Sequence, residues 1–166
     1  PNPELLPHLR QRMDGVDGAE LIEAAVAPEP GRGSLRLFNF APLNSLRAPT
    51  GLRRNFPGLQ ERGHVTVQQV TLEQLLGRAG VDPDARNWLV IDAPGEEGTI
   101  IDQLQHSPYR HAFASIFLTA GIEPMYEGAR SAPELISLLE AQGFEPAAQP
   151  DRADADWPRF HLRLDR

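Results

Sequence analysis

The fold class of this chain is decided by the segment Trp88-Leu89-Val90-Ile91-Asp92-Ala93-Pro94-Gly95-Glu96-Glu97. An apolar run ends in an aspartate, turns through Pro94-Gly95 and leads into a helical pattern. In an open α/β sheet, ligands bind in the crevice outside the carboxyl ends of parallel strands. We therefore expect Asp92 at the rim of such a crevice, with Glu97 facing it from the next helix. A second interpretation stays open, in which Asp92 and Glu96 only favour the positive end of that helix.

Apolar runs alternate with helical patterns along the rest of the chain. Capping boxes predict two helices, one beginning after Thr71 and one after Ser131. A first helix is expected from Asn2 to Met13, with Pro7 delaying its regular part. Strands are expected near residues 19–27, 34–40, 65–69, 88–92, 112–118 and 157–164, and a long loop at 41–63. This order predicts an α/β fold: a mostly parallel sheet with helices on both faces and a late antiparallel strand.

Composition excludes several classes of function. The 166 residues suit one α/β domain over 1–166, and 16 basic against 23 acidic residues give a net charge of -7, which argues against nucleic-acid binding. The chain has no Cys, and every basic residue is Arg, so thiolate chemistry, a Walker-type lysine and a Schiff-base lysine are excluded. No apolar run reaches membrane-spanning length and no leader opens the chain, so we expect a cytoplasmic protein.

The motifs resemble those of the FkbM-type S-adenosylmethionine-dependent methyltransferases, over nearly the whole chain. The matching residues are Val65 to Leu76, Ile91-Asp92 with Gly95 and Glu97, and Leu135 to Leu139 running to Gly143-Phe144, together with Pro1-Asn2-Pro3, Ala25-Val26 and Gly31 upstream. The resemblance implies a Rossmann-like class I methyltransferase sheet. It also implies O-methylation of a hydroxyl on a sugar, a lipid or a natural product, so that the expected partner is a small-molecule or glycan acceptor.

The same resemblance implies roles for individual residues. Ala25, Asp92 and Pro94 would contact the cofactor; Asn44, Ser45 and Glu97 would contact the acceptor; Asp92 and Glu97 would be the catalytic carboxylates. Turn chemistry explains the Asn44-Ser45 pair equally well. The chain also departs from the family pattern. Val90 stands where the family often has Lys, and Thr119-Ala120-Gly121 where it commonly has Glu.

The elements that hold the adenosine half of the cofactor in such enzymes are missing from this sequence. The glycines of Gly31-Arg32-Gly33 precede a strand pattern and are typical of a turn. We therefore expect a sheet that is incomplete in its N-terminal half, in a segment of a longer polypeptide, with weak or absent binding of S-adenosylmethionine. The strands at 19–27 and 88–92 would then either pair directly or leave exposed edges. The alternative function is a non-catalytic, methyltransferase-like binding or scaffold module of a larger protein.

Two further groups of residues are weaker candidates. Met125 to Gly128 follows a strand and is interpreted as either an acceptor lid or a surface loop. Asp102, His106 and His111 lie close in sequence, but Ser107-Pro108 interrupts the helix between the two histidines. We therefore expect no metal site.

Overall fold

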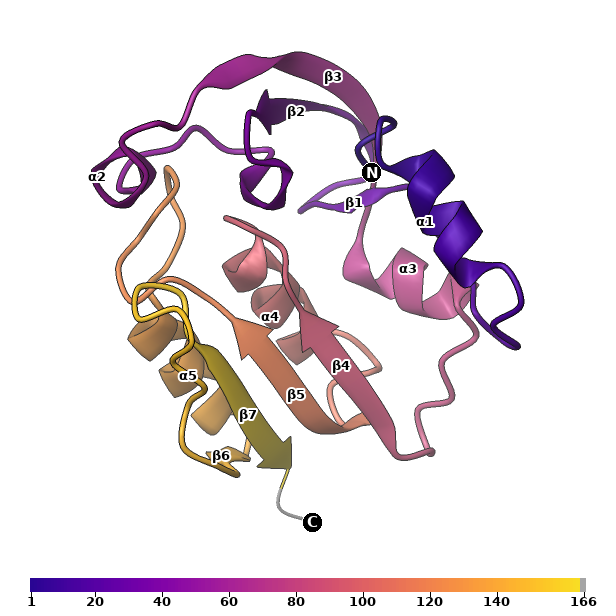
Figure 1. The fold of residues 1–166 in the computed structure, drawn as a ribbon. Coiled ribbons are helices and arrows are strands. Elements are labelled where there is room, and N and C mark those ends of the chain that lie inside the picture. Colours follow the sequence, from indigo (N-terminus) through magenta and orange to yellow (C-terminus); the bar gives the residue numbers. More distant parts are fainter. Residues whose placement is uncertain (165–166) are drawn as a thin grey trace.

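Two β-sheets and five α-helices make up the described part of the chain, residues 1–164, which confirms the expected α/β class. The structure is a computed structural model. Its elements are α1 (Leu6–Met13), β1 (Ala25–Val26), β2 (Gly31–Phe38), the 3-10 helix η1 (Ala41–Leu43), α2 (Leu52–Asn55), β3 (Glu61–Val70), α3 (Leu72–Arg78), β4 (Asn87–Ile91), α4 (Glu97–Gln105), β5 (Phe113–Thr119), α5 (Ala132–Glu140), β6 (Phe144–Pro146) and β7 (Arg159–Leu164). Figure 1 shows the sheet of β1 to β3 above the sheet of β4 to β7.

The larger sheet has the strand order β4-β5-β7-β6. β4 and β5 run parallel, and β7 runs antiparallel to both β5 and β6. The parallel strands predicted near 88–92 and 112–118 and the late antiparallel strand are therefore confirmed. Because β4 and β5 are parallel, the turns that follow Ile91 and Thr119 open at the same edge of the sheet.

The smaller sheet has the order β1-β3-β2, with β1 parallel and β2 antiparallel to β3. The strand predicted over 19–27 is wrong in extent, because only Ala25–Val26 form β1. Two glutamates in that segment, Glu20 and Glu23, form ion pairs with arginines of α3 and α1. Charged side chains held in this way leave too few apolar residues for a longer buried strand.

β4 is an exposed edge of the larger sheet. Within residues 1–164 it pairs with β5 alone, and β1 pairs instead with β3 in the other sheet. Of the two outcomes expected for residues 88–92, an exposed edge is therefore the one observed. Trp88 is 72% exposed and Val90 63% exposed. The expectation of helices on both faces is wrong here, since α4 and α5 lie behind the strands and the face with these two residues is open (Figure 1).

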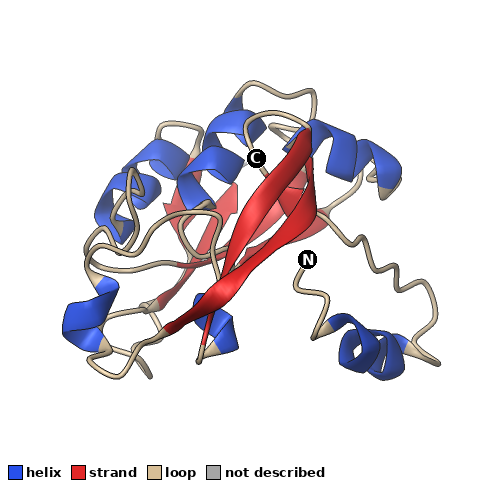
Figure 2. Cartoon of the chain, turned by 90° about the horizontal axis from the view of Figure 1, so that it is seen from above, coloured by secondary structure: helices blue, strands red, loops and turns tan. Residues whose placement is uncertain are grey.

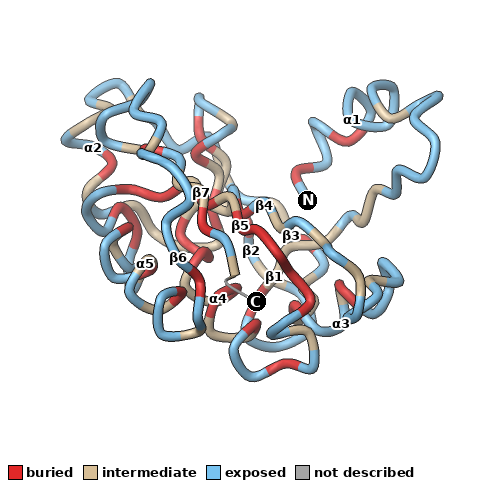
Figure 3. The backbone as a smooth tube through the Cα atoms, turned by 90° about the horizontal axis from the view of Figure 1, so that it is seen from below, coloured by how far each residue is buried: buried red, intermediate tan, exposed pale blue. Residues whose placement is uncertain are grey.

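The main core lies between the larger sheet and α3, α4 and α5. Its buried residues are Leu72, Leu76, Ile91, Ile100, Ile101, Leu104, Ala112, Phe113, Ile116, Leu118, Ala120, Ala132, Leu135, Leu139, Phe144 and Leu162. Figure 2 shows these helices gathered along one side of the strands. Figure 3 shows β5 as a mostly buried strand and α1 as a mostly exposed helix at the periphery. The core thus fixes β4, β5 and α4, the elements that border the site described below.

Capping residues explain where the helices begin. The Thr71 hydroxyl accepts from the Gln74 amide at 3.2 Å, and the Gln74 side chain accepts from the Thr71 amide at 3.1 Å. The Glu134 carboxylate accepts from the Ser131 amide at 2.7 Å. Both predicted capping boxes are thereby confirmed. Pro7 lies in the first turn of α1, where its missing amide is not needed, so α1 begins late as expected.

Residues 41–63 are more ordered than the long loop predicted for them, because they contain η1, α2 and the start of β3. They are held by a second core cluster of Phe38, Leu43, Leu52, Met125 and Tyr126. Backbone hydrogen bonds add to this packing: the Thr50 amide donates to the Met125 carbonyl at 2.9 Å, and the Glu127 amide to the Ala48 carbonyl at 2.8 Å. The segment therefore joins β2 to β3 within the smaller sheet and packs against the residues that follow β5.

Candidate functional site

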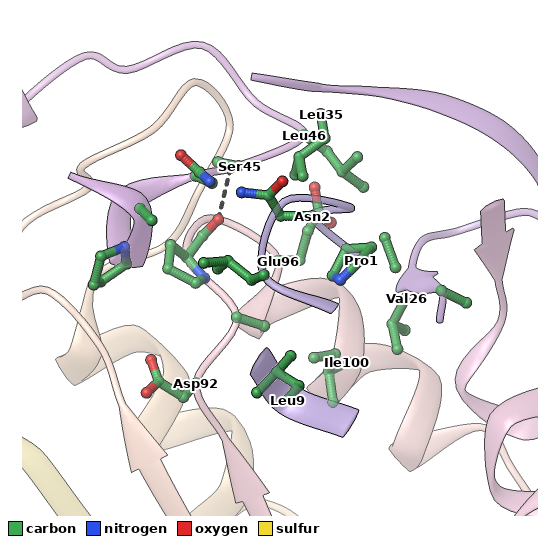
Figure 4. Close-up of a pocket in the computed structure, with 18 residues that line it drawn as sticks. Pro1, Asn2, Leu9, Val26, Leu35, Ser45, Leu46, Asp92, Glu96 and Ile100 are labelled. Carbon is green, nitrogen blue, oxygen red and sulfur yellow. Dashed lines mark hydrogen bonds between the residues drawn. The ribbon is translucent and has the colours of Figure 1, made fainter. Parts of the chain in front are cut away.

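A cavity of about 400 Å³ lies outside the carboxyl end of β4. Its walls come from α1 and the residues before it, from β1, from residues 41–46 and from the turn between β4 and α4. The lining residues are Pro1, Asn2, Leu5, Leu9, Ala24, Ala25, Val26, Leu35, Ala41, Pro42, Asn44, Ser45, Leu46, Asp92, Ala93, Pro94, Glu96 and Ile100. Figure 4 shows Asp92 at one end of this cavity and Pro1 and Val26 toward the other. The volume lies within the range of small-molecule sites.

Most of the residues that the sequence singled out lie together here. Ala25, Asn44, Ser45, Asp92 and Pro94 all line the cavity, although they come from separate parts of the chain. Glu97 is not among the lining residues, because its position in the first turn of α4 buries it, with 4% of its surface exposed. Asp92 therefore lies at the cavity, as expected from its place at the strand end. The expectation that Glu97 faces the same cavity is wrong, because Glu97 is buried behind the wall.

Asn44 and Ser45 hold the wall as well as line it. The Ser45 hydroxyl donates to the Pro94 carbonyl at 2.6 Å, drawn as a dashed line in Figure 4, and accepts from the Arg47 amide at 3.1 Å. The Asn44 side chain accepts from the Phe38 amide at 2.8 Å. These bonds fix residues 44–45 against the turn that follows β4. Their turn chemistry is thus visible in the structure, and their contact with a ligand stays a prediction.

Gly95 allows the turn after β4 to pass close to its neighbours. Its φ is +88°, a conformation that favours glycine. A Cβ atom there would lie 2.9 Å from the Ser45 hydroxyl oxygen and 3.1 Å from Cγ of Tyr126. The glycine therefore lets Ser45, the turn and Tyr126 pack together at the cavity wall.

Glu97 is a buried carboxyl group beside the cavity. Burial is the largest cause that raises the pKa of Glu97, from 4.5 to about 7, and the charges of Glu96 and Asp92 raise it further. Hydrogen bonds from the backbone amides of Gly95 and Glu97 act in the opposite direction. The pKa of the Tyr126 hydroxyl is also raised, by burial first and by the charge of Glu97 second. Glu97 therefore exchanges a proton near neutral pH.

Glu96 is neutralised by Arg47, which was not among the residues predicted from the sequence to belong to the site. The Arg47 guanidinium donates from Nε to one Glu96 oxygen at 2.7 Å and from NH2 to the other at 3.1 Å. The Thr99 hydroxyl donates to the same carboxylate at 2.6 Å. Of the two carboxylates that line the cavity, Asp92 is the one whose side chain forms no hydrogen bond or ion pair within residues 1–164. Arg47 and Glu96 are 49 positions apart, so no local sequence pattern predicts their pairing. The Glu96-Glu97 doublet was the one sequence feature that indicated a nearby positive charge.

The weaker candidates have other roles. Met125 and Tyr126 are buried in the second core cluster, which does not suit a lid, whereas Glu127 and Gly128 form an exposed turn, as the surface-loop interpretation expects. The Tyr126 hydroxyl donates to the Leu43 carbonyl at 2.8 Å. The Asp102 carboxylate pairs with Arg130 at 2.8 Å. Within residues 1–164, no group of three or more His, Asp or Glu residues is placed to hold a metal ion.

Comparisons of this chain with protein-family models, with curated proteins and with solved structures gave no match. Among the helices of residues 1–164, none combines the length and the apolar character that crossing a membrane requires. Functional inference therefore rests on the cavity at β4 and on the carboxyl groups around it.

Proposed function

We propose that this chain acts in S-adenosylmethionine-dependent O-methylation, as an FkbM-type, Rossmann-like domain whose cavity at β4 takes an acceptor hydroxyl. The acceptor class is a sugar, a lipid or a natural product. One observation carries the proposal: residues assigned to ligand binding from their motifs, Ala25, Asn44, Ser45, Asp92 and Pro94, line one cavity. Unrelated motif matches have no reason to meet at one cavity at a strand end.

Asp92 and Glu97 have different roles in this proposal. Asp92 is exposed to the cavity, where its oxygens accept a hydrogen bond from the acceptor hydroxyl. Glu97 has a pKa of about 7 and its titration is coupled to the charge of Asp92. A group with a pKa near the working pH is suited to hold a proton released from a hydroxyl. Asp92 thus orients the acceptor and is the carboxylate placed to receive its proton, while Glu97 lies behind the wall and responds to the charge of Asp92.

The residues present fit only part of the cofactor. In class I methyltransferases a glycine-rich turn leads from a strand into a helix beneath the adenosine half. Here β1 leads through Pro28 and Gly31 into the antiparallel β2 instead. The carboxylates that line the cavity are Asp92 and Glu96, and Glu96 is already paired with Arg47. The cavity therefore suits the charged methionine end, and we derive no reaction step through the bound cofactor.

Methyl transfer from isotope-labelled S-adenosylmethionine at millimolar concentration tests the proposal. The protein is incubated with a panel of hydroxyl-bearing sugars, glycolipids and polyols, and labelled products are detected by mass spectrometry. We expect labelled methyl ether with the native protein and at least about tenfold less with Asp92→Asn, since a lost charged hydrogen bond of about 1.5–3 kcal/mol slows the step by that order. Asp84→Asn, an exposed carboxylate outside the cavity, is the matched control.

A second candidate function is a methyltransferase-like binding module without catalysis. This candidate is favoured because polar side chains of the cavity wall already have partners within the protein. Ser45 donates to the Pro94 carbonyl, and Glu96 is paired with Arg47. The same panel separates the two candidates. Saturable binding of a panel member, seen by ligand-detected NMR and weakened by Asp92→Asn, without any methyl ether at saturating cofactor, supports the module and rejects methyl transfer. Absence of both binding and transfer rejects both.

A further inference from the structure

A second cavity, of about 210 Å³, opens on the other side of the turn after β4. Asp92 and Pro94 line both cavities, so the turn forms the wall between them. The remaining lining residues are Phe40, Pro42, Leu43, Phe56, Thr119, Asp154 and Trp157. Asp92 also belongs to the function proposed above, whereas the aromatic residues and Asp154 of this second cavity do not.

Three aromatic side chains surround the second cavity. Phe40 precedes η1, Phe56 follows α2, and Trp157 lies in the loop before β7. The rings of Phe40 and Phe56 are nearly parallel, at 24°, with their centres 6.4 Å apart. Trp157 is fixed by an edge contact with Tyr126, at 6.3 Å between ring centres. Phe40 is 51% exposed, so part of its side chain is open to solvent beside the cavity.

The polar groups of this cavity are mainly hydrogen-bond acceptors. Asp92 and Asp154 both contribute carboxylates, which accept hydrogen bonds and carry negative charge. One oxygen of Asp154 accepts from the backbone amides of Asp156 and Trp157, at 3.0 and 3.1 Å, and this fixes the side chain. Thr119 supplies the hydroxyl of the lining, and it already accepts from Nε of Arg159 at 3.3 Å.

The neighbouring basic groups do not neutralise these two carboxylates in the structure. Arg159 donates to Thr119, and Arg54 on α2 is paired with Glu123. The whole chain carries a net charge of -7, which adds to the negative potential at the cavity. Aromatic ring faces attract cations, and the combination of such faces with carboxylates is the chemistry that recognises alkylated ammonium groups.

We propose that the second cavity, formed by Phe40, Phe56 and Trp157 with Asp92 and Asp154, binds a small organic ligand through an alkylated ammonium group. The methylated nitrogen lies against the rings, and the carboxylates offset its charge. Binding of the ammonium ligand requires neither S-adenosylmethionine nor methyl transfer. It can therefore be tested independently of the function proposed above.

Tryptophan fluorescence measures this binding directly. The chain has two tryptophans, Trp88 and Trp157, and Trp88 lies outside the cavity, so Trp88→Phe leaves Trp157 as the only reporter. Titration of this variant with choline, at constant ionic strength, should saturate with a Kd of about 1 mM or below. The uncharged carbon isostere of choline, 3,3-dimethyl-1-butanol, should bind at least about tenfold more weakly.

Substitutions in the Trp88→Phe background locate the site. Phe40→Ala and Asp154→Asn should each weaken choline binding by about three- to tenfold. Asn at 154 keeps the oxygen that accepts the two backbone amides, so the loop is preserved. Ile122→Ala and Asp84→Asn, which are exposed positions outside the cavity, are the matched controls and should leave the Kd unchanged. Circular dichroism confirms that each variant is folded.

Three results would overturn the proposal. Equal affinity for choline and its carbon isostere would define an apolar groove with no preference for charge. An unchanged Kd in Phe40→Ala and Asp154→Asn would place choline elsewhere on the protein. Saturable binding of methyl glucoside in the absence of choline binding would replace the ammonium site with a sugar site.

Discussion

At the scale of single residues, Glu97 has the most distinctive chemistry. Its carboxyl group is buried between the first turn of α4 and Tyr126, and the protein holds it by backbone amides with no arginine partner comparable to that of Glu96. Its folded-state pKa of about 7 lies above the 4.5 of an ordinary Glu. The folded state therefore binds the Glu97 proton more tightly than the unfolded state does.

The free energy of unfolding should depend on pH through the ionisation of Glu97. Its contribution is fully present below about pH 4.5 and is lost as pH rises toward 7, where the buried carboxyl ionises. Glu97→Gln keeps an uncharged acceptor at all pH values. We expect Glu97→Gln to gain about 2–3 kcal/mol in unfolding free energy relative to the native protein between pH 4.5 and pH 8, at about 1.4 kcal/mol per pKa unit. Urea unfolding at a series of pH values measures this, and a pH-independent difference would contradict it.

The sequence predicted the position of some of these residues better than others. Asp92 follows an apolar run and precedes Pro94-Gly95, so its place at a strand end depends on local pattern alone. The pairing of Arg47 with Glu96 depends on how residues 41–56 pack across the chain, and no local pattern encodes that packing. The second cavity was missed for the same reason: Phe40, Asp92 and Trp157 are distant in sequence and meet only through the second core cluster.

At the scale of elements, β4 combines a buried and an open face. Ile91 is buried in the main core, whereas Trp88 is largely exposed and touches Phe117 with a ring separation of 5.8 Å. Ile91→Ala should lower the unfolding free energy by about 2–5 kcal/mol. Trp88→Ala should cost about 1 kcal/mol or less, because it removes one aromatic contact and little buried area. Urea denaturation of both variants measures the contrast, and equal losses would mean that Trp88 is covered in solution.

Helix ends and strand partners differ in how far they can be predicted. The capping boxes at Thr71 and Ser131 involve residues three positions apart, so the sequence suffices to place both helices. The division into two sheets is a matter of long-range pairing. The sequence left open whether 19–27 pairs with 88–92 or leaves exposed edges, and in the structure Ala25–Val26 form β1, which pairs with β3. The charged residues Glu20 and Glu23 already indicated, within the local sequence, that a long buried strand could not form there.

At the scale of the whole molecule, Arg47 joins the two sheets. It lies in the segment held by the smaller sheet and binds Glu96 and Thr99 at the start of α4. Arg47→Met would leave Glu96, which is 8% exposed, without its cation and should destabilise the protein by about 3 kcal/mol. Arg36→Met, in the more exposed pair with Glu61, should cost about 1 kcal/mol or less. Thermal unfolding measures both, and adding Glu96→Gln should recover part of the Arg47→Met loss.

The arrangement of the two sheets also determines how well the chain binds S-adenosylmethionine. Class I methyltransferases hold the adenosine half by a glycine-rich turn and a ribose-binding acid, whereas β1 here leads through a turn into β2, and both strands pair with β3. Each missing hydrogen bond forfeits about 0.5–1.5 kcal/mol, and more where a charge takes part. Several together weaken affinity by about three orders of magnitude. Calorimetric titration of residues 1–166 with S-adenosylmethionine should therefore show weak binding or none. Micromolar affinity, lost in Asp92→Asn and kept in Asp84→Asn, would mean that the cavity at β4 holds the whole cofactor with a different set of residues.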